Sequence, residues 1–345
     1  MNARRFFLDQ GWGETRGVVT LGGKPERLII ARDDEPVDFT VGSRAVGRIR
    51  AIDRGLAMAF VDLGEGSDAI LNFSAGIGPL VEGGWVEVEI KSEARRGKAP
   101  SVRWLGPAAG PARMLTPGPS VEDRLLALSR GGAIEGGAAA RAVADQAQEE
   151  ALETVFPLSG GGTIAVETTR ALTAVDVDVG GRHGEMAKRA ARAANLAAIS
   201  EAARVLRLKG LGGLVVIDLA GRGHDGPVLL AAARAAFAAD NPGVAIGAVS
   251  RFGALELTAP RRCRPTVEVL CDDAGALKPL TMAMSLARAL EREAAHDRGA
   301  RLTALTAPAV ADAASGALTR LAGRFGPRLA VRSQPGLNGY EISRE

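Results

Sequence analysis

The chain is poor in the residues that build disulfide frameworks and zinc sites. Its 345 residues include two cysteines and three histidines. Cys263 and Cys271 lie eight residues apart, so they form no CxxC pair, and no histidine lies at ligand spacing near them. This argues against a structural zinc site within one chain. A disulfide is not expected in the cytoplasm.

Long apolar segments are also missing. No run of 18 apolar residues occurs without a charge, so we expect no transmembrane helix. The first five residues include two arginines, but only Phe6, Phe7 and Leu8 follow before Asp9, which is too short for the apolar region of a signal peptide. The expected location is the cytoplasm, with no membrane partner.

Lysine is scarce, although the chain is basic. Only 6 of the 43 basic residues are lysine, the net charge is +3 and the isoelectric point is about 9.1. Arginine suits bidentate contacts with phosphate. The same excess, together with abundant alanine and glycine, is also produced by a GC-rich coding bias, so composition supports a nucleic-acid partner only weakly. The length and the 46% hydrophobic content predict a globular protein of two or three domains.

Two predicted apolar strands are each followed by an aspartate. Residues 172–175 lead into Asp176, and residues 214–217 lead into Asp218. A carboxylate at the end of a buried strand is costly unless something pairs with it. The two acids are 42 residues apart and joined by one predicted helix, so they can lie side by side. A divalent cation would hold both ionised; the alternative is two ordinary acids that cap turns.

Residues 41–104 carry the pattern of an all-β unit. Predicted strands cover 44–52, 56–62, 68–71, 85–92 and 100–105, with glycine-rich turns between them, which is typical of a small barrel. The run VGSRAVGRIRAIDRGLAMAFVDLGEGSDAILNFS resembles the S1 class of OB-fold, which binds single-stranded RNA. Phe60 lies where S1 domains stack a base, and the basic surround consists of Arg48, Arg50, Arg95, Arg96 and Lys98. The alternatives are that Phe60 is a core aromatic and that residues 95–98 are a solvated hairpin tip.

The other segments alternate between strand and helix patterns. A β-hairpin is predicted in 10–32 and a Gly- and Pro-rich linker in 106–119. Residues 162–249 follow a strand–helix–strand–helix–strand order after a first strand, which indicates an α/β layer. Further predicted helices cover 120–129, 138–154, 280–296 and 308–322, and further predicted strands cover 266–270, 301–305, 329–332 and 341–342.

Three segments after the barrel, GGTIAVETTRALTAVDVDVG, NLAAISEAARVLRLKGLGGLVVIDL and SRFGALEL, make the chain resemble the ribonuclease E/G family. The resemblance implies a multidomain protein of the α+β and α/β classes. Its expected parts are an N-terminal hairpin of an RNase H-like subdomain (1–36), an inserted S1 OB-fold domain (37–106), a linker and helices of the RNase H-like subdomain (107–157), a DNase I-like α/β catalytic subdomain (158–260) and a small C-terminal α+β domain (261–345).

The resemblance also implies a site. The family's metal-binding aspartates correspond to Asp176 and Asp218, which would hold Mg²⁺ for hydrolysis of single-stranded RNA to products with 5′-phosphate and 3′-hydroxyl ends. The family usually has Asn at the position of Asp178, which here either adds a metal ligand or repels the phosphate. Arg182 and Arg251 are candidates for phosphate contact. The histidines of the same loops are more simply solvated, and two further residues that match family positions, Asn195 and Lys209, can also be structural.

The chain departs from the family pattern in several places. Arg170 replaces a Glu, Ala220-Gly221-Arg222 stands where an acid is common, and the CPxC zinc link is absent. There is little room for the subdomain that senses a 5′-monophosphate. A monomer or a zinc-independent homodimer is therefore expected.

Three functions remain open from the sequence. The first is a Mg²⁺-dependent endoribonuclease in RNA processing or decay. The second is a non-catalytic S1-type RNA-binding protein that retained the ribonuclease E/G fold. The third is a general translation-associated S1 protein, which predicts that residues 37–106 alone account for RNA binding.

Overall fold

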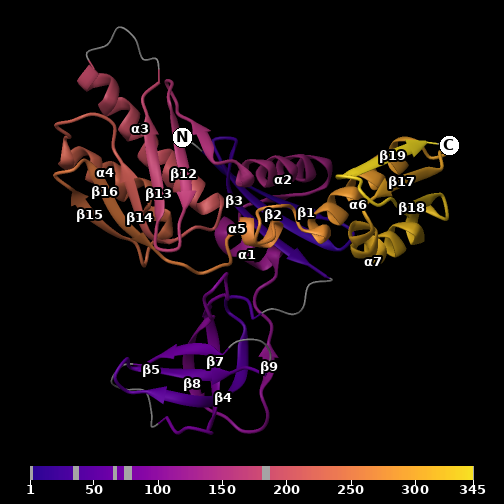
Figure 1. Cartoon of the computed structure of the whole chain (residues 1–345), viewed down its shortest axis with the longest axis horizontal. Helices are drawn as coiled ribbons and strands as arrows, with labels where there is room; N and C mark the ends of the chain where they lie inside the picture. The colour runs from indigo at the N-terminus through magenta and orange to yellow at the C-terminus, as the bar shows by residue number, and fades with distance from the viewer. Residues whose placement is uncertain (1–2, 34–38, 65–67, 74–79, 181–186, 345) are drawn as a thin grey trace.

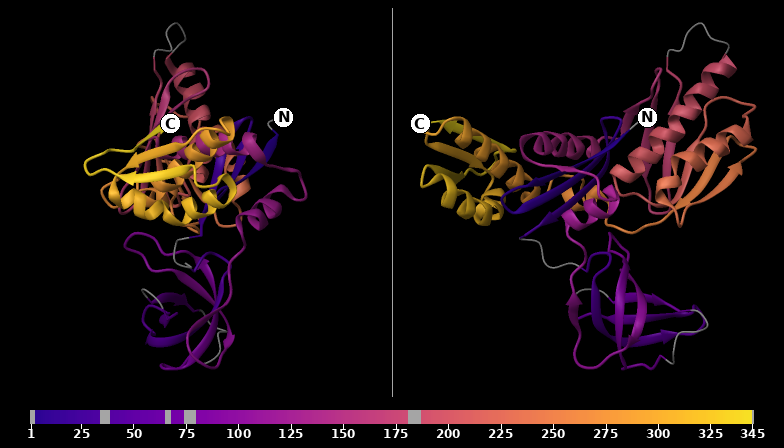
Figure 2. Two further views of the ribbon diagram at one scale, coloured as in Figure 1. Left: turned by 90° about the vertical axis from the view of Figure 1, so that its right-hand side faces the viewer. Right: turned by 180° about the vertical axis from the view of Figure 1, so that it is seen from behind.

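A computed structural model describes residues 3–33, 39–64, 68–73, 80–180 and 187–344. Four sheets and their helices make up the molecule. Figure 1 shows a central part that contains the N-terminal strands, with the six-stranded sheet on one side and the C-terminal unit on the other. A β-barrel lies below this row, and the two further views in Figure 2 show the same arrangement.

The central sheet combines strands from both sides of the barrel in sequence. Its order is β10-β1-β2-β3, formed by β1 (Arg4–Gln10), β2 (Glu14–Leu21), β3 (Lys24–Arg32) and β10 (Ile134–Glu135). The predicted hairpin is confirmed as β2 and β3, while β1 and β10 were not predicted. Because β10 follows the barrel in the chain and pairs with β1, the barrel is an insertion into this unit.

Two helices cover the central sheet. Helix α1 (Val121–Ser129) begins at Ser120, whose side chain accepts from the backbone of Asp123 while Asp123 bonds back to the backbone of Ser120, so the predicted helix start is confirmed. Helix α2 (Gly137–Leu152) packs its alanine face on Phe7 and Val18.

The barrel closes through pairing of its first two strands. The sheet order is β5-β6-β8-β7-β4-β9, and β5 also pairs with β4. Its strands are β4 (Arg44–Asp53), β5 (Met58–Asp62), β6 (Ala69–Asn72), β7 (Trp85–Ser92), β8 (Ser101–Pro107) and β9 (Arg113–Thr116). The prediction of a plain linker over 106–119 is wrong, because β9 lies within it and pairs with the free side of β4.

A second six-stranded sheet, separate from that of the barrel, has the order β11-β12-β13-β14-β16-β15. Within it, β13 and β14 are the one parallel pair of neighbouring strands. Its strands are β11 (Val155–Pro157), β12 (Thr163–Thr168), β13 (Thr173–Asp178), β14 (Gly213–Asp218), β15 (Ala245–Val249) and β16 (Ala254–Ala259). The predicted strand–helix–strand–helix–strand order up to residue 249 is confirmed, but the strand that follows it was not predicted. Strand β16 turns back from β15 and inserts between β15 and β14. It was missed because its apolar contribution is only two alternating leucines, which become buried through this pairing.

Helices α3 (Ala187–Leu208) and α4 (Gly226–Ala236) cover one face of this sheet. Alternate strand residues that include Val175, Val177 and Ile217 point into that core and are buried. The intervening residues therefore point to the opposite face, since side chains alternate along a strand.

Helix α5 (Thr266–Leu270) replaces a predicted strand. The segment TVEVL has strong β propensity, but the carbonyl of Pro265 accepts from Glu268 and Val269, and the Thr266 hydroxyl donates to the carbonyl of Leu208 at the end of α3. Tertiary contacts thus overrode local preference.

The last part of the chain follows the prediction. It contains α6 (Pro279–His296), β17 (Leu302–Thr306), α7 (Pro308–Phe325), β18 (Leu329–Ser333) and β19 (Tyr340–Arg344), with sheet order β18-β17-β19. No helix in the described segments has the length and apolarity needed to cross a membrane.

Buried ion pairs join the C-terminal unit to the central sheet. Glu14 on β2 accepts from Arg288 of α6 at 2.6 Å and from Arg32 of β3 at 2.7 Å, and all three side chains are buried. Near the start of β3, at the opposite end of the strand from Arg32, Glu26 forms ion pairs with Arg4 of β1 and Arg207 of α3. Burial opposes ionisation of Glu26, but these two arginines outweigh it and lower the pKa of the carboxyl.

Candidate active site

The strand register places two aspartates side by side. Asp176 on β13 is the Cα partner of Asp218 on the parallel strand β14. Paired residues of neighbouring strands project to the same face, and here it is the face opposite to the helices. Both residues are exposed. The expectation that the two acids meet is confirmed.

The strand ends differ slightly from the prediction. Strand β13 continues through Asp176 to Asp178, whereas Asp218 is the last residue of β14. Asp178 is two residues beyond Asp176 and projects to the same face, one step nearer the edge of the sheet. Its Oδ1 accepts from the backbone N–H of Gly180 at 2.9 Å, so one carboxylate oxygen already stabilises a turn.

Small side chains flank the aspartate pair. The same row across the sheet reads Ala165, Asp176, Asp218, Ala254. Within the described part of the chain, no side chain forms an ion pair or a hydrogen bond with either aspartate. Adjacent strands lie about 4.8 Å apart, and two like charges at that separation repel by about 1 kcal/mol in a water-like dielectric and about 3.5 kcal/mol at an effective value near 20.

The row fits a hard divalent cation. Carboxylate oxygens are suitable ligands for Mg²⁺, which binds through one or two carboxylates and keeps several waters. No group of three or more Asp, Glu, His or Cys side chains in the described residues is placed to hold one metal ion. Among the described residues the row thus offers two carboxylates, and an ion held there would complete its coordination with other oxygens.

The loop after Asp218 is fixed from helix α3. Asn195 is buried there, its Nδ2 donates to the carbonyl of Ala220 at 3.0 Å, and its Oδ1 accepts from the N–H of the same residue at 2.9 Å. Asn195 therefore positions the strand end without reaching the acids. Lys209, at the end of α3, donates to the carbonyl of Ala151 at 2.9 Å, and burial lowers its pKa.

A tight turn between β15 and β16 borders the same edge. The N–H of Leu219 donates to the carbonyl of Gly253 at 3.0 Å, which ties this turn to the residue after Asp218. Phe252 in the turn is 80% exposed, and the guanidinium carbon of Arg251 lies 4.7 Å from the centre of its ring. Phe252 was not singled out from the sequence, although an aromatic between Arg and Gly in a predicted turn is a usable signal.

The histidines and the other basic candidate are placed differently. His224 is half-buried in the loop before α4 and packs beside Gly253. Arg182 and His183 lie outside the described residues. Arg170 is exposed in the turn between β12 and β13, at the opposite end of these strands from Asp178.

On the barrel, Phe60 lies outside the core. Its neighbours Ala59 and Val61 are fully buried inside the barrel, and Phe60 projects outwards between them and is half-buried. The alternative that Phe60 fills the barrel core is wrong. Its role in stacking stays a prediction.

The two barrel arginines differ in how they are held. Arg48 is exposed and lies over the ring of Trp85, with 5.7 Å from its guanidinium carbon to the ring centre. Arg50 pairs with Asp62 at 2.8 Å and with Asp68 at 3.3 Å. The hydrogen bond from Arg50 lowers the pKa of Asp62 and raises that of Arg50 itself. Arg48 is thus the freer of the two to meet a phosphate.

The hairpin tip between β7 and β8 contacts the main body. Arg96 pairs with Asp273 at 2.6 Å and donates to the carbonyl of Asp272 at 2.9 Å. The tip therefore is not a fully solvated hairpin, and Arg96 helps to dock the barrel. Lys98 at the same tip is exposed.

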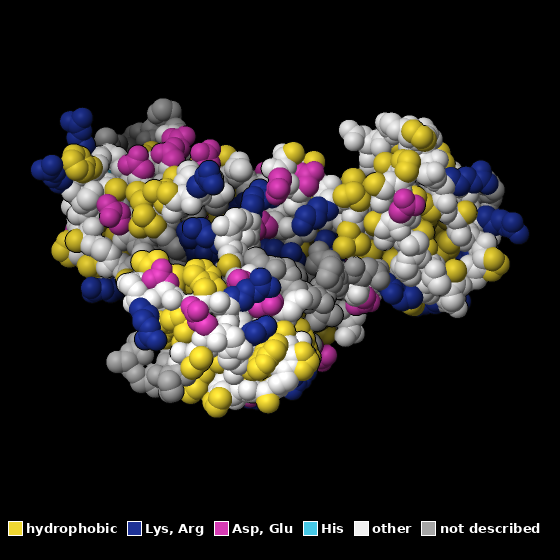
Figure 3. Space-filling view, turned by 60° about the horizontal axis from the view of Figure 1, so that its bottom comes forward, with side chains coloured by type: hydrophobic (Ala, Val, Ile, Leu, Met, Phe, Trp, Pro, Cys, Tyr) yellow, Lys and Arg dark blue, Asp and Glu magenta, His cyan; other side chains and the backbone are white. Residues whose placement is uncertain are grey.

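The structure does not bring the barrel candidates to the aspartates. Strands β13 and β14 run away from the barrel (Figures 1 and 2). Asp176 and Asp218 lie near the carboxyl ends of these strands, which is the end of the sheet that is farther from the barrel. Basic and acidic side chains also alternate over the barrel face that Figure 3 shows, rather than forming one basic surface.

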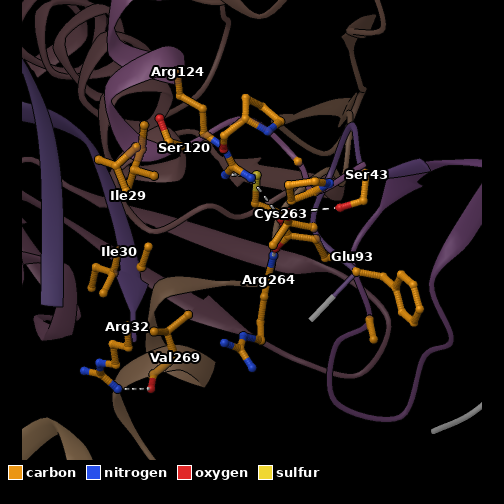
Figure 4. A pocket seen from close by; sticks show the side chains of 18 of the residues that line it. Ile29, Ile30, Arg32, Ser43, Glu93, Ser120, Arg124, Cys263, Arg264 and Val269 are labelled. Atoms are coloured by element: carbon orange, nitrogen blue, oxygen red, sulfur yellow. Dashed lines mark hydrogen bonds and ion pairs between the residues drawn. The ribbon is translucent and has the colours of Figure 1, made fainter. Parts of the chain in front are cut away.

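A cavity of about 550 Å³ lies between the barrel and the central sheet. Figure 4 shows Ile29, Ile30 and Arg32 of β3 on one side, with Glu93 and Ser43 of the barrel on the other. Glu93 accepts from the backbone of Arg264 at 2.8 Å and lies 3.6 Å from Arg124. The cavity contains neither Asp176 nor Asp218, so it is separate from the candidate active site.

Comparison with known proteins identifies the part of the chain that holds this site. The model of the ribonuclease E/G family matches residues 137–262, which include both aspartates and the turn at 250–253. The chain is 38% identical over 120 residues to ribonuclease E of Escherichia coli, which covers 33% of this chain and 11% of that protein. It is 32% identical over 136 residues to a chloroplastic ribonuclease E/G-like protein of Arabidopsis thaliana, which covers 36% of this chain and 13% of that protein.

Ribonuclease G of Escherichia coli is 28% identical over 179 residues, covering 49% of this chain and 36% of that protein. The matched region is therefore well under two thirds of the length of each of these relatives. Residues 137–262, which hold both aspartates, are therefore similar to the ribonuclease E/G family.

Proposed function

We propose that this protein is an endoribonuclease that cleaves single-stranded RNA with Mg²⁺ held by Asp176 and Asp218. The observation that carries the proposal is the register of β13 and β14, which pairs two exposed carboxylates within the segment that is similar to the ribonuclease E/G family. The relatives that match this segment are named ribonucleases. A carboxylate pair without a cationic partner among the described side chains is the arrangement that a hard metal ion stabilises.

A bound Mg²⁺ would supply a nucleophilic water and neutralise charge that develops on the phosphate. The chain's own residues supply the geometry. Asp176 and Asp218 fix the position of the ion, and the flanking Ala165 and Ala254 leave room for a phosphate. Asn195 holds the loop after Asp218, and Arg251 offers a permanent charge to a neighbouring phosphate. We infer products with 5′-phosphate and 3′-hydroxyl ends.

The barrel adds RNA affinity in this proposal. We interpret it as an S1-type OB-fold that binds the strand through Phe60 and Arg48, in a protein that acts in the cytoplasm as a monomer or zinc-independent homodimer. Binding by phosphate contacts releases counterions, so affinity should fall steeply as salt rises. A flat salt response would argue against a nucleic-acid partner.

The test is cleavage of a labelled AU-rich single-stranded RNA with Mg²⁺ and with EDTA. We expect Mg²⁺-dependent cutting by the wild type. In Asp176→Asn and Asp218→Asn it should fall by about 100-fold or more, because charge neutralisation by a metal is worth several kcal/mol. Glu256→Gln is the matched control, because Glu256 projects to the same sheet face but lies opposite Val216, one row away from the pair.

A second function, RNA binding without cleavage, is favoured by one observation. The barrel lies on the far side of the sheet from the aspartate pair, so one chain in this arrangement does not surround an RNA at the acids (Figure 1). Equal RNA binding by all four proteins, without any cutting, would establish this alternative. A ribonuclease would instead show Mg²⁺-dependent cutting that both Asp→Asn substitutions abolish.

A further inference from the structure

Aromatic side chains are scarce in this chain, and one of them is left in solvent. The chain has 9 Phe, 3 Trp and 1 Tyr. Among the described large hydrophobic residues, Phe252 is the most exposed, at 80%, followed by Leu56 at 65%. A phenyl ring in water contributes nothing to the hydrophobic core, so fold stability does not explain why an aromatic is present here.

The turn that carries Phe252 is held firmly. The Ser250 hydroxyl accepts from the N–H groups of Phe252 and Ala254 at 3.3 and 3.2 Å. The N–H of Ser250 donates to the carbonyl of Ala254 at 2.8 Å, and that of Gly253 to the carbonyl of Ser250 at 3.0 Å. Gly253 has φ +89°, which a side chain at this position would strain. The ring is therefore presented from a defined backbone rather than from a loose loop.

The turn also lies at the candidate active site. Ala254 is the register partner of Asp218, and Gly253 accepts from the residue that follows Asp218. Phe252 is thus two residues from the row of the aspartate pair. The barrel aromatic Phe60 belongs to a part of the molecule that lies on the far side of the sheet (Figure 2). Among the described residues, a base contact next to the acids therefore comes from the sheet and its turns.

The chemistry around the ring fits one partner. Arg251 stacks on the ring at 4.7 Å and keeps its charge at any physiological pH. An exposed aromatic beside a guanidinium is the combination that binds single-stranded nucleic acid, where the ring stacks on a base and the cation meets a phosphate. The chain neighbours of Phe252 are Arg251 and Gly253, so the tip of the turn offers a protein partner no second apolar side chain beside the ring.

We propose that Phe252 is the stacking platform for a base next to the scissile phosphate, with Arg251 on the adjoining phosphate. The proposal rests on the function proposed above, since it concerns the same substrate. It goes further by giving the core domain its own base-binding residue, independent of the barrel. Stacking is tolerant of sequence, so the platform would position the strand without selecting a base.

The test is a thermodynamic cycle between the ring and individual bases. Binding of a labelled single-stranded RNA of about ten nucleotides is titrated in EDTA, for the wild type and for Phe252→Ala. A series of RNAs with one abasic nucleotide at successive positions is titrated in parallel. Phe252→Ala should weaken binding by about 5- to 150-fold, the range of one base–aromatic stack. At one position, or at two adjacent positions, removal of the base should weaken binding to the wild type but not to Phe252→Ala.

Matched variants separate stacking from other effects. Phe252→Trp should restore binding, and Leu126→Ala, which removes an exposed side chain from helix α1, should leave it unchanged. Equal binding by Phe252→Ala and the wild type would overturn the proposal. The proposal would also be overturned if the binding free energy lost through Phe252→Ala and that lost through the abasic nucleotide simply added at every position. A change in the oligomeric state of Phe252→Ala with unchanged RNA binding would also overturn it, since the ring would then serve a protein contact.

The outcome is distinguishable from that of the proposed function. The titrations need no cleavage, so a wild type that never cuts RNA but shows the ring–base coupling would refute the nuclease and support the platform. Mg²⁺-dependent cleavage without any coupling would support the nuclease and refute the platform.

Discussion

Removal of one carboxylate from the aspartate pair should make the metal-free protein more stable, not less. Asp176 and Asp218 are register partners, exposed, and without a cationic partner among the described side chains. At about 4.8 Å, the backbone spacing of neighbouring strands, two carboxylates in a water-like environment repel by about 1 kcal/mol. Asp176→Asn keeps the shape of the side chain and removes this repulsion.

Mg²⁺ should reverse the order of stability. At a concentration ten times its dissociation constant, an ion that binds only the folded protein stabilises it by about 1.4 kcal/mol. The wild type should gain this stabilisation, and Asp176→Asn should gain little of it. Urea unfolding in EDTA and in Mg²⁺, followed by circular dichroism, measures both effects.

Glu149→Gln is the matched control, because Glu149 is an exposed acid on helix α2. It should change neither the stability in EDTA nor the gain in Mg²⁺ by more than a few tenths of a kcal/mol. If Asp176→Asn is less stable than the wild type in EDTA, and Mg²⁺ stabilises both proteins equally, the two carboxylates do not form a metal site.

Other parts of the molecule give three further predictions. Arg288→Met should destabilise the protein by about 3–5 kcal/mol in urea unfolding, because it leaves the buried Glu14 short of a partner; a loss below about 1 kcal/mol would contradict the buried network. Glu26 has a lowered pKa, so its ion pairs stabilise the fold above its usual value of 4.5, and this stabilisation is lost as pH falls through the lower folded value. Glu26→Gln should therefore show a smaller difference between urea midpoints at pH 7 and pH 3 than the wild type; an unchanged difference would refute this role. Phe60→Ala should weaken RNA binding by about 1–3 kcal/mol and leave the barrel folded. Val61→Ala, inside the barrel, should instead destabilise the fold with little direct effect on binding. Thermal unfolding and RNA titration of both variants distinguish the two faces of β5.

Local signals accounted for much of the secondary structure. Ser120 and Asp123 predicted the start of α1, and the structure has the reciprocal hydrogen bonds of that motif. Strand-like runs separated by glycine-rich turns predicted the barrel strands and both strands of the hairpin at β2 and β3. These features depend on neighbours within a few residues, so the sequence contains them directly.

The errors occurred where distant residues decide the outcome. Residues 266–270 have the composition of a strand, but contacts with Leu208 and the start at Pro265 make them a helix. Strand β9 lies in a segment that is rich in Gly and Pro and is ordered by the free side of β4. Strand β16 becomes buried by inserting between two other strands. In each case a partner far along the chain supplies the stabilising contacts.

The sequence by itself determined that Asp176 and Asp218 belong to two apolar strands and that they can meet. Only the tertiary structure decided that they are register partners, which residues flank them, and that Phe252 is presented beside them. It also decided that the barrel with Phe60 lies away from this edge (Figure 2). The physical reason is that side-chain alternation is a property of each strand, whereas register and domain placement depend on packing between residues far apart in the chain.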